Sequence, residues 1–127
     1  MINLSTPEQA RRLLRIHAFA DNGCTAENSL LHSLRPFSGS LKTQHFHETI
    51  AAVRVLAAEF GEPHCRHETV RLFYSIIYFA RAWGLSPQGM LQRNGLLNPE
   101  QTATLSSWWK LWKKRCITSV SYTHLRA

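Results

Sequence analysis

The fold of this chain is organised around one stretch, His67-Glu-Thr-Val-Arg-Leu-Phe-Tyr-Ser-Ile-Ile-Tyr-Phe-Ala-Arg-Ala-Trp-Gly84. At about 100° per residue, its apolar side chains cover half of a helix, which is far wider than the usual apolar stripe. A helix of this kind is covered by neighbours on several sides. Gly84 can take the left-handed backbone conformation and Pro87 follows it closely, so we expect the helix to end at Gly84.

The other half of this helix is patterned as well. Two arginines and two tyrosines, spaced three, four and three residues apart, form one ridge: Arg71, Tyr74, Tyr78 and Arg81. Guanidinium groups bind phosphates or carboxylates, and tyrosine rings stack or anchor an interface, so the ridge is a candidate binding surface. The alternative is a boundary row whose tyrosine rings are buried and whose hydroxyl groups alone meet water.

Length and composition describe one ordinary globular domain. The chain has 127 residues, of which 44% are apolar and 18% charged, and it has no run long enough to span a bilayer, which takes roughly 20 helical residues. Three cysteines without scaffold-like spacing predict a reduced, cytoplasmic protein, and the first residues lack the pattern of a secretory signal. The net charge of +7 raises the chance of a polyanionic partner.

The last residues form a segment of a different kind. Ser119-Val-Ser-Tyr-Thr-His-Leu-Arg-Ala127 resembles the translated sequencing-adapter read-through found at the ends of open reading frames in metagenomic assemblies. This resemblance implies a single helical domain over residues 1–118 and a non-native tail over 119–127. The chain stays basic without the tail, because Arg126 is its only Lys, Arg, Asp or Glu residue.

Capping residues and apolar periodicity predict further helices over residues 7–20, 25–34, 43–60 and 86–93 and from residue 99 onward. Because the connector after Phe60 is short, we expect the helix before it to form an antiparallel hairpin with the central helix. No segment has the alternating pattern of a strand. The prediction is therefore an all-α, single-domain bundle of about four long and two short helices around the central helix 67–84.

Imidazole and thiol groups gather just before the central helix. His64, Cys65 and His67 could hold a metal ion with a further ligand from elsewhere, although the adjacent arginine repels cations. A second pair of histidines begins the preceding helix and lies roughly 25 Å away, too far to complete the site. Cys65 also has the basic surroundings of a nucleophilic thiol, but no oxyanion donors accompany it. We expect helix-end histidines here, with no metal and no cofactor.

A DNA-binding interpretation comes from Ala80-x-x-x-Gly84-Leu85-Ser86, which together with Met90 resembles the helix-turn-helix pattern. The resemblance implies a motif over residues 80–94, in which four polar side chains contact base edges or phosphates: Gln88, Gln92, Arg93 and Asn94. A proline and a glycine inside the expected recognition helix depart from this pattern, and Arg93 occupies a position that is usually apolar. The alternative is an ordinary helix that leads into a short connecting helix.

The segment 108–115, Trp-Trp-Lys-Leu-Trp-Lys-Lys-Arg, resembles an amphipathic surface-binding helix. Tryptophans on one helix face are more often packed on a protein core, and lysines are favoured near the C-terminal end of a helix. We therefore expect this face to pack on the bundle.

These features together predict a non-enzymatic helical interaction module with an unknown protein partner. The carboxylates are scattered and no phosphate-binding glycine loop occurs, so no reaction is indicated. The interaction module predicts that Tyr78→Ala or Arg81→Ala weakens partner binding with little loss of fold. The first alternative, a DNA-binding protein, predicts that Arg93→Ala weakens duplex binding. The second alternative is the thiol or metal site at residues 64–67.

Overall fold

A computed structural model of the chain shows a helical protein, and the all-α prediction is confirmed. No strand occurs in the ranges that the structure describes, although Leu34 and Phe37 form an isolated bridge. The structure describes residues 6–18, 20, 23–25, 27–35, 37–60 and 67–126, without the side chains of 58–60, 67 and 116–126. The elements are α1 (Pro7–His17), α2 (Leu30–Leu34), α3 (Thr43–Phe60), α4 (His67–Ala80), the π-helical turn η1 (Arg81–Leu85), α5 (Met90–Arg93) and α6 (Pro99–Arg126).

The first two helices begin and end with local hydrogen bonds. The Thr6 hydroxyl accepts from the Gln9 amide of α1, and the Gln9 side chain accepts from the Thr6 amide, which is the expected capping box. The helix ends at His17 and not near residue 20. The expected start of α2 at Thr25 is also wrong: Ser29 caps this helix, because its hydroxyl accepts from the His32 amide.

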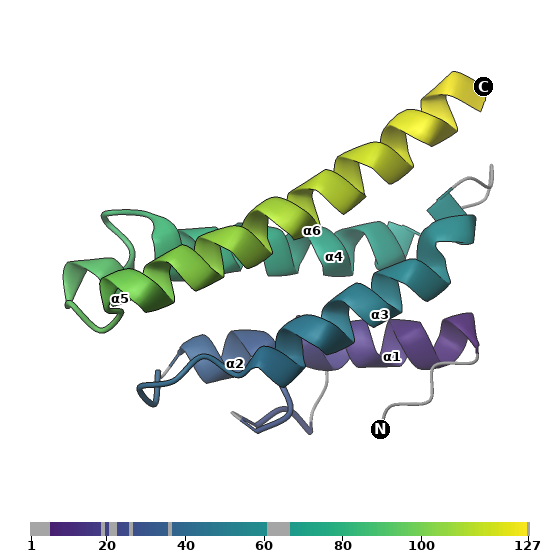
Figure 1. Cartoon of the computed structure of the whole chain (residues 1–127). Helices are drawn as coiled ribbons and strands as arrows, with labels where there is room; N and C mark the ends of the chain where they lie inside the picture. Colours follow the sequence, from purple (N-terminus) through teal and green to yellow (C-terminus); the bar gives the residue numbers. More distant parts are fainter. Residues whose placement is uncertain are drawn as a thin grey trace.

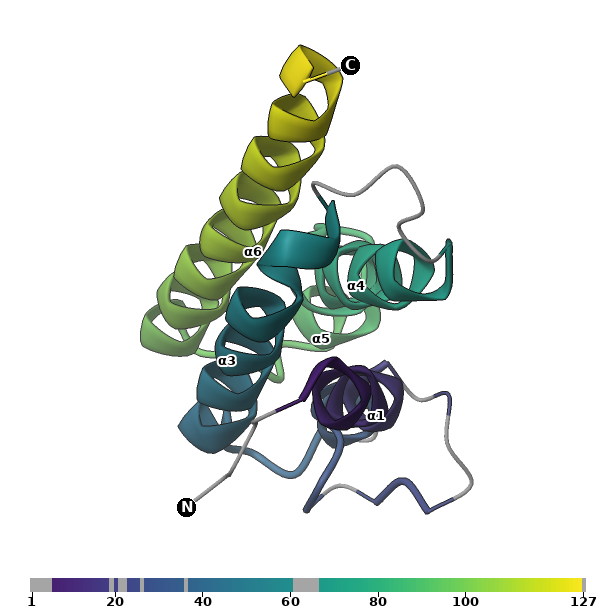
Figure 2. The ribbon, with the colours of Figure 1, turned by 90° about the vertical axis from the view of Figure 1, so that its right-hand side faces the viewer.

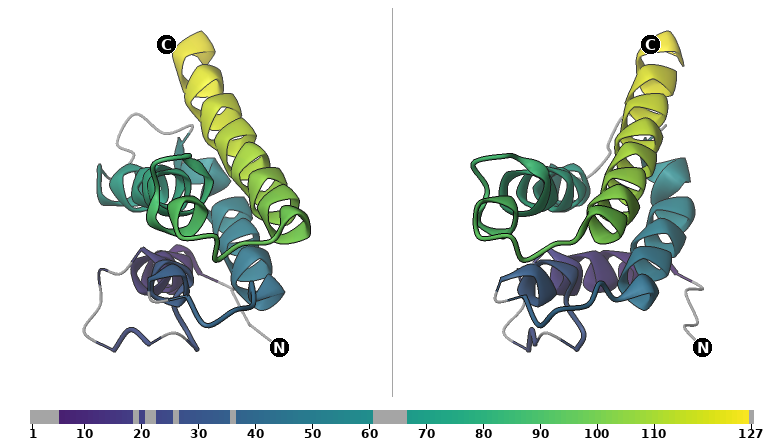
Figure 3. Two further views of the ribbon diagram at one scale, coloured as in Figure 1. Left: turned by 90° about the vertical axis from the view of Figure 1, so that its left-hand side faces the viewer. Right: turned by 60° about the vertical axis from the view of Figure 1, so that its left-hand side comes forward.

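The long helices form two pairs that cross each other. Figure 2 looks almost along α1 and α4, which lie one above the other, with α3 and α6 on one flank of that pair. Figure 1 shows the C-terminal part of α6 extending beyond the other helices. Figure 3 shows the segment with η1 and α5 at one end of the bundle, where it connects α4 to α6. In this arrangement α4 and η1 lie beside the first half of α6.

The expected hairpin of α3 with α4 is not the main contact of α3, which packs chiefly along α1 and also meets α6. A buried polar pair explains why α3 packs along α1: His17 at the end of α1 bonds Glu48 of α3 at 2.7 Å. His17 accepts the backbone N–H of Leu30 on its Nδ1 atom at 2.9 Å, so its ring proton lies on Nε2 and is donated to Glu48. One imidazole thus joins α1, α2 and α3.

A second buried histidine extends this polar layer. His45 is only 2% exposed, and its Nε2–H donates to the Glu27 carbonyl at 2.9 Å. Burial lowers the pKa of His45, and the neighbouring His17 adds to this effect, although the bond to the carbonyl opposes it. Burial disfavours the charged form of Glu48, but the hydrogen bonds from His17 and Gln44 and the two neighbouring imidazoles together outweigh burial and lower the pKa of that carboxyl. Both groups therefore favour their usual forms at neutral pH.

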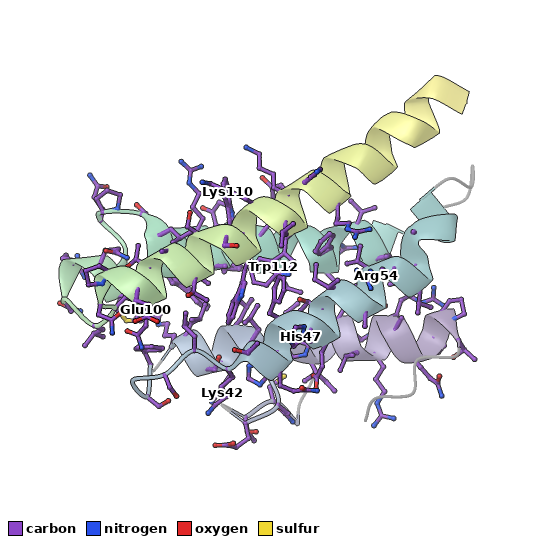
Figure 4. All side chains as sticks on the ribbon, viewed as in Figure 1. Lys42, His47, Arg54, Glu100, Lys110 and Trp112 are labelled. Atoms are coloured by element: carbon purple, nitrogen blue, oxygen red, sulfur yellow. The ribbon has the colours of Figure 1, made fainter. Side chains whose placement is uncertain are left out.

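The tryptophan face of α6 packs on the core, as expected. Trp112 is fully buried, and Trp108 stacks on Phe46 of α3 with ring centroids 5.2 Å apart. The Trp112 indole N–H donates to the Thr49 hydroxyl at 2.8 Å. Figure 4 shows Trp112 pointing from α6 toward α3, whereas Lys110 points away from the bundle. These contacts fix the rotation of α6 about its own axis.

The central helix ends differently from the prediction. Gly84 does not take the left-handed conformation, which the structure shows at Gly39 and Gly95. The backbone widens into the π-helical turn η1, which the Ser86 amide closes by donating to the Arg81 carbonyl. A β-carbon on Gly84 would lie 2.5 Å from the Leu105 side chain of α6. The glycine is therefore needed for the close approach of η1 to α6.

None of the helices in the described ranges combines the length and apolar character that a membrane crossing requires.

Candidate functional site

A groove of about 720 Å³ lies between α4 with η1 and the first half of α6. One wall comes from α4 and η1: Tyr74, Ile77, Tyr78, Arg81, Ala82 and Leu85. The other wall comes from α6, and the turn after η1 completes the lining: Ser86, Pro87, Ser106, Trp109 and Lys113. We call this feature the α4–α6 groove. Its volume falls in the range of ligand-binding pockets.

Trp109 is the largest aromatic residue of the groove and is held in a fixed position. Its indole N–H donates to the Ile77 carbonyl of α4 at 3.1 Å, which joins the two walls. The ring is partly buried and packs against the core cluster. Gly84 also lets η1 approach Leu105 of α6 closely. This contact and the Trp109 hydrogen bond hold the two walls together.

Two cations surround this indole, one from each wall. The Arg81 guanidinium lies 5.6 Å from the Trp109 ring centroid, and the Lys113 ammonium lies 4.9 Å from it. Both distances fit cation–π contacts. Neither cation forms an ion pair with a carboxylate in the described part of the chain, where the ion pairs involve Glu8, Glu48 and Glu68. Both positive charges are therefore available to a bound group.

The tyrosines of the predicted ridge form the exposed edge of the groove. Tyr74 is 59% exposed and Tyr78 is 54% exposed, which is more than a boundary row with buried rings would show. Their rings stack on each other with centroids 6.4 Å apart. Tyr78 also meets the Phe79 ring edge-on. These rings form a preorganised apolar surface with hydroxyl groups in solvent.

The ridge does not belong to one site as a whole. Tyr74, Tyr78 and Arg81 line the α4–α6 groove, but Arg71 lies at a smaller hollow on the side of α1. That hollow also contains Arg15, whose guanidinium is already bonded to Glu68 at 2.9 Å. The structure therefore brings three of the four predicted residues together.

The residues of the DNA-binding alternative lie on the connection between η1 and α6. α5 has only four residues, and Gly89 is its N-cap. A β-carbon on Gly89 would lie 2.4 Å from a backbone oxygen. Gln88, Arg93 and Asn94 are exposed. Gln92 is bonded within the protein: its amide donates to the Gly84 carbonyl at 2.9 Å and to Thr102 at 3.0 Å. A one-turn helix presents far fewer side chains to a DNA groove than a recognition helix does.

The residues of the thiol and metal alternative, His64, Cys65 and the side chain of His67, lie outside the described residues. Within the described ranges, no group of three or more His, Cys, Asp or Glu side chains could hold a metal ion. His45 is buried in the polar layer, whereas His47 is exposed on α3. The two histidines at the start of α3 therefore point in different directions.

The α6 side chains next to the groove cations and rings, Trp109 and Lys113, were not predicted as binding residues. The tryptophan face was expected to pack on the bundle, yet Trp109 also reaches the groove. The spacing of four residues between Trp109 and Lys113 places them on one side of a helix, so the sequence contains the pattern. It does not show that α4 lies beside this side of α6.

Comparison of the chain with protein-family models, with curated proteins and with solved structures finds no significant match.

Proposed function

We propose that this protein is a non-catalytic interaction module that binds a protein partner in the α4–α6 groove. The observation that carries the proposal is the arrangement around Trp109. An indole held by a hydrogen bond, two exposed tyrosines and two cations that have no carboxylate partner among the described residues converge on one concave surface. Tryptophan, tyrosine and arginine are the residues that contribute most binding energy at protein interfaces.

The exposed tyrosines support this proposal. Burying an aromatic side chain contributes strongly to folding, yet Tyr74 and Tyr78 are each more than half exposed. The neighbouring residues on α4 that face the core are fully buried. A bound partner would cover these rings. Because the rings are already ordered in the free protein, binding would cost little additional side-chain entropy.

The DNA-binding alternative has less support from the geometry. Its contacts would come from a one-turn helix, and Gln92 would have to give up two hydrogen bonds within the protein. The basic charge that motivated the alternative is shared by the α4–α6 groove and the exposed lysines of α6.

A display selection tests the proposed function. Random peptides of about 12 residues, enough for about three helical turns along the groove, are selected on the full chain. They are then screened against a Tyr78→Ala/Arg81→Ala double variant. We expect enriched peptides that bind the wild type and lose at least about tenfold in affinity, or about 1.4 kcal/mol, on the double variant.

Arg12→Ala is the matched control, since Arg12 is an exposed arginine on α1, away from the groove. Enriched peptides should bind this variant as they bind the wild type. Circular dichroism of each variant verifies that the helices remain. If no enriched peptide distinguishes the double variant from the wild type, the α4–α6 groove is not a peptide-binding site.

A further inference from the structure

We infer that the segment captured by the α4–α6 groove is acidic and carries a bulky apolar side chain between its carboxylates. This inference rests on the proposed function and specifies the chemistry of the partner. It follows from the charges, the apolar base and the length of the groove.

The charges of the groove have one sign. Arg81 contributes a positive charge from η1 and Lys113 contributes one from α6, and no acidic residue is among the described residues that line the groove. Both cations lie within 6 Å of the same indole ring centroid, so in the free protein they repel each other across it. A carboxylate placed near each cation removes this repulsion and gains a charge-assisted hydrogen bond.

The surface between the cations is apolar. Ile77, Leu85 and the Trp109 ring line the groove together with the tyrosine rings, and both cations lie close to the Trp109 ring. A peptide made only of acidic residues would leave this surface in water. An aliphatic or aromatic side chain that enters the groove buries it, while flanking carboxylates reach the cations.

The length of the groove suits a short segment. Tyr74 and Leu85 mark its extent along α4 and η1, a separation of roughly 16 Å at 1.5 Å per residue. About three helical turns or five extended residues cover this distance. A groove between two helices is also the kind of site in which amphipathic helices bind.

A nucleic acid is a weaker fit to the same residues. The groove offers two cations, whereas strong binding of a phosphate backbone comes from many such contacts. Its largest ring, Trp109, is fixed by the bond to Ile77 and partly buried, so it does not provide an open stacking platform. The apolar base favours a side-chain anchor.

A charge exchange tests the inference. The groove-dependent peptides from the display selection are sequenced, and each is synthesised again with Gln in place of every Asp and Glu. Fluorescence anisotropy then measures the affinity of both forms for the wild type and for Arg81→Glu/Lys113→Glu. A random single-stranded oligonucleotide of similar length is measured in parallel.

We expect the enriched peptides to be rich in Asp and Glu around one bulky apolar residue. Their Gln forms should bind the wild type at least about tenfold more weakly. A selection on the charge-reversed variant should enrich Lys and Arg in place of Asp and Glu.

Equal affinity of the acidic and Gln forms would overturn the inference and leave the proposed function intact. Groove-dependent binding of the oligonucleotide that is tighter than that of the peptides would also overturn it, in favour of a nucleic-acid ligand. A selection without any groove-dependent peptide would contradict the proposed function itself.

Discussion

The hydrogen bond between Trp112 and Thr49 is a small feature with a large expected effect on stability. It joins α6 to α3 at a distance of 2.8 Å, and both residues are fully buried. It also sets the rotation of α6, which decides that Trp109 and Lys113 face α4. Replacing Thr49 by valine preserves the shape of the side chain and removes the hydroxyl that accepts from the indole.

The magnitude follows from the burial. Thr49→Val leaves the indole N–H of Trp112 without its acceptor in a site that water does not reach, which costs about 1–3 kcal/mol. The substitution leaves almost no cavity, and threonine and valine have similar helix propensities, so neither effect adds much. We expect the free energy of unfolding to fall by about 2 kcal/mol, which is a large part of the about 5–15 kcal/mol of an ordinary domain.

Urea denaturation followed by circular dichroism measures this loss. Thr102→Val is the matched control, since its hydroxyl accepts from a half-buried amide that keeps its bond to the Gly84 carbonyl; its effect should stay within about 0.5 kcal/mol. A double-mutant cycle with Trp112→Phe isolates the bond, because in that background the indole N–H is absent and Thr49→Val should cost little. If Thr49→Val costs the same in both backgrounds, the bond does not stabilise the fold.

Further predictions concern the close approach at η1, the polar layer and the DNA-binding alternative. Gly84→Ala should destabilise the protein by about 1–3 kcal/mol through overpacking against α6, whereas Gly23→Ala, which meets no atom within 4 Å, should have almost no effect in the same urea assay. Burial lowers the pKa of His45 below 6.5, so the unfolded chain binds its proton first as the pH falls. The free energy of unfolding should therefore be highest above pH 6.5 and decrease as the pH falls below it. Urea titrations at several pH values should show a weaker pH dependence for His45→Gln. Anisotropy of a labelled random duplex should show the same salt-dependent affinity for Arg93→Ala as for the wild type, and a marked loss would restore the DNA-binding alternative.

The sequence predicts the helices well where local residues decide them. The capping box at Thr6 begins α1 as expected, and α3 ends at Phe60, as the glycine after it predicts. These features depend on hydrogen bonds and backbone preferences within a few residues. The burial of Trp108 and Trp112 follows from helical periodicity in the same way.

Features that depend on distant partners were not predictable. Helical periodicity places Ala57 on the same stripe of α3 as the buried Val53, but Ala57 is exposed, whereas His45 and Thr49 are buried. The helix is rotated because partners far away in the sequence satisfy these side chains: His45 donates to the Glu27 carbonyl and Thr49 accepts from Trp112 of α6. Gly84 was predicted to end the helix because its partner is also distant in the sequence. Only the structure shows that Leu105 of α6 lies against it.

The candidate site was predicted in part. The spacing of the ridge identified Tyr74, Tyr78 and Arg81, because residues three or four apart share one side of a helix. The contribution of α6 depends on which helix packs beside α4, and the sequence contains no local indication of this. Arg71 is separated from the groove for the same reason: it lies on the side of α4 against which α1 packs.

The most direct test of the binding site is the affinity of one groove-selected peptide for three proteins: the wild type, Arg81→Ala and Arg12→Ala. Both arginines are exposed, so neither substitution should alter the fold. We expect Arg81→Ala to weaken binding by at least about tenfold, while Arg12→Ala stays within about twofold of the wild type. Equal losses for the two variants would show that the peptide recognises the overall positive charge, and the α4–α6 groove would not be its binding site.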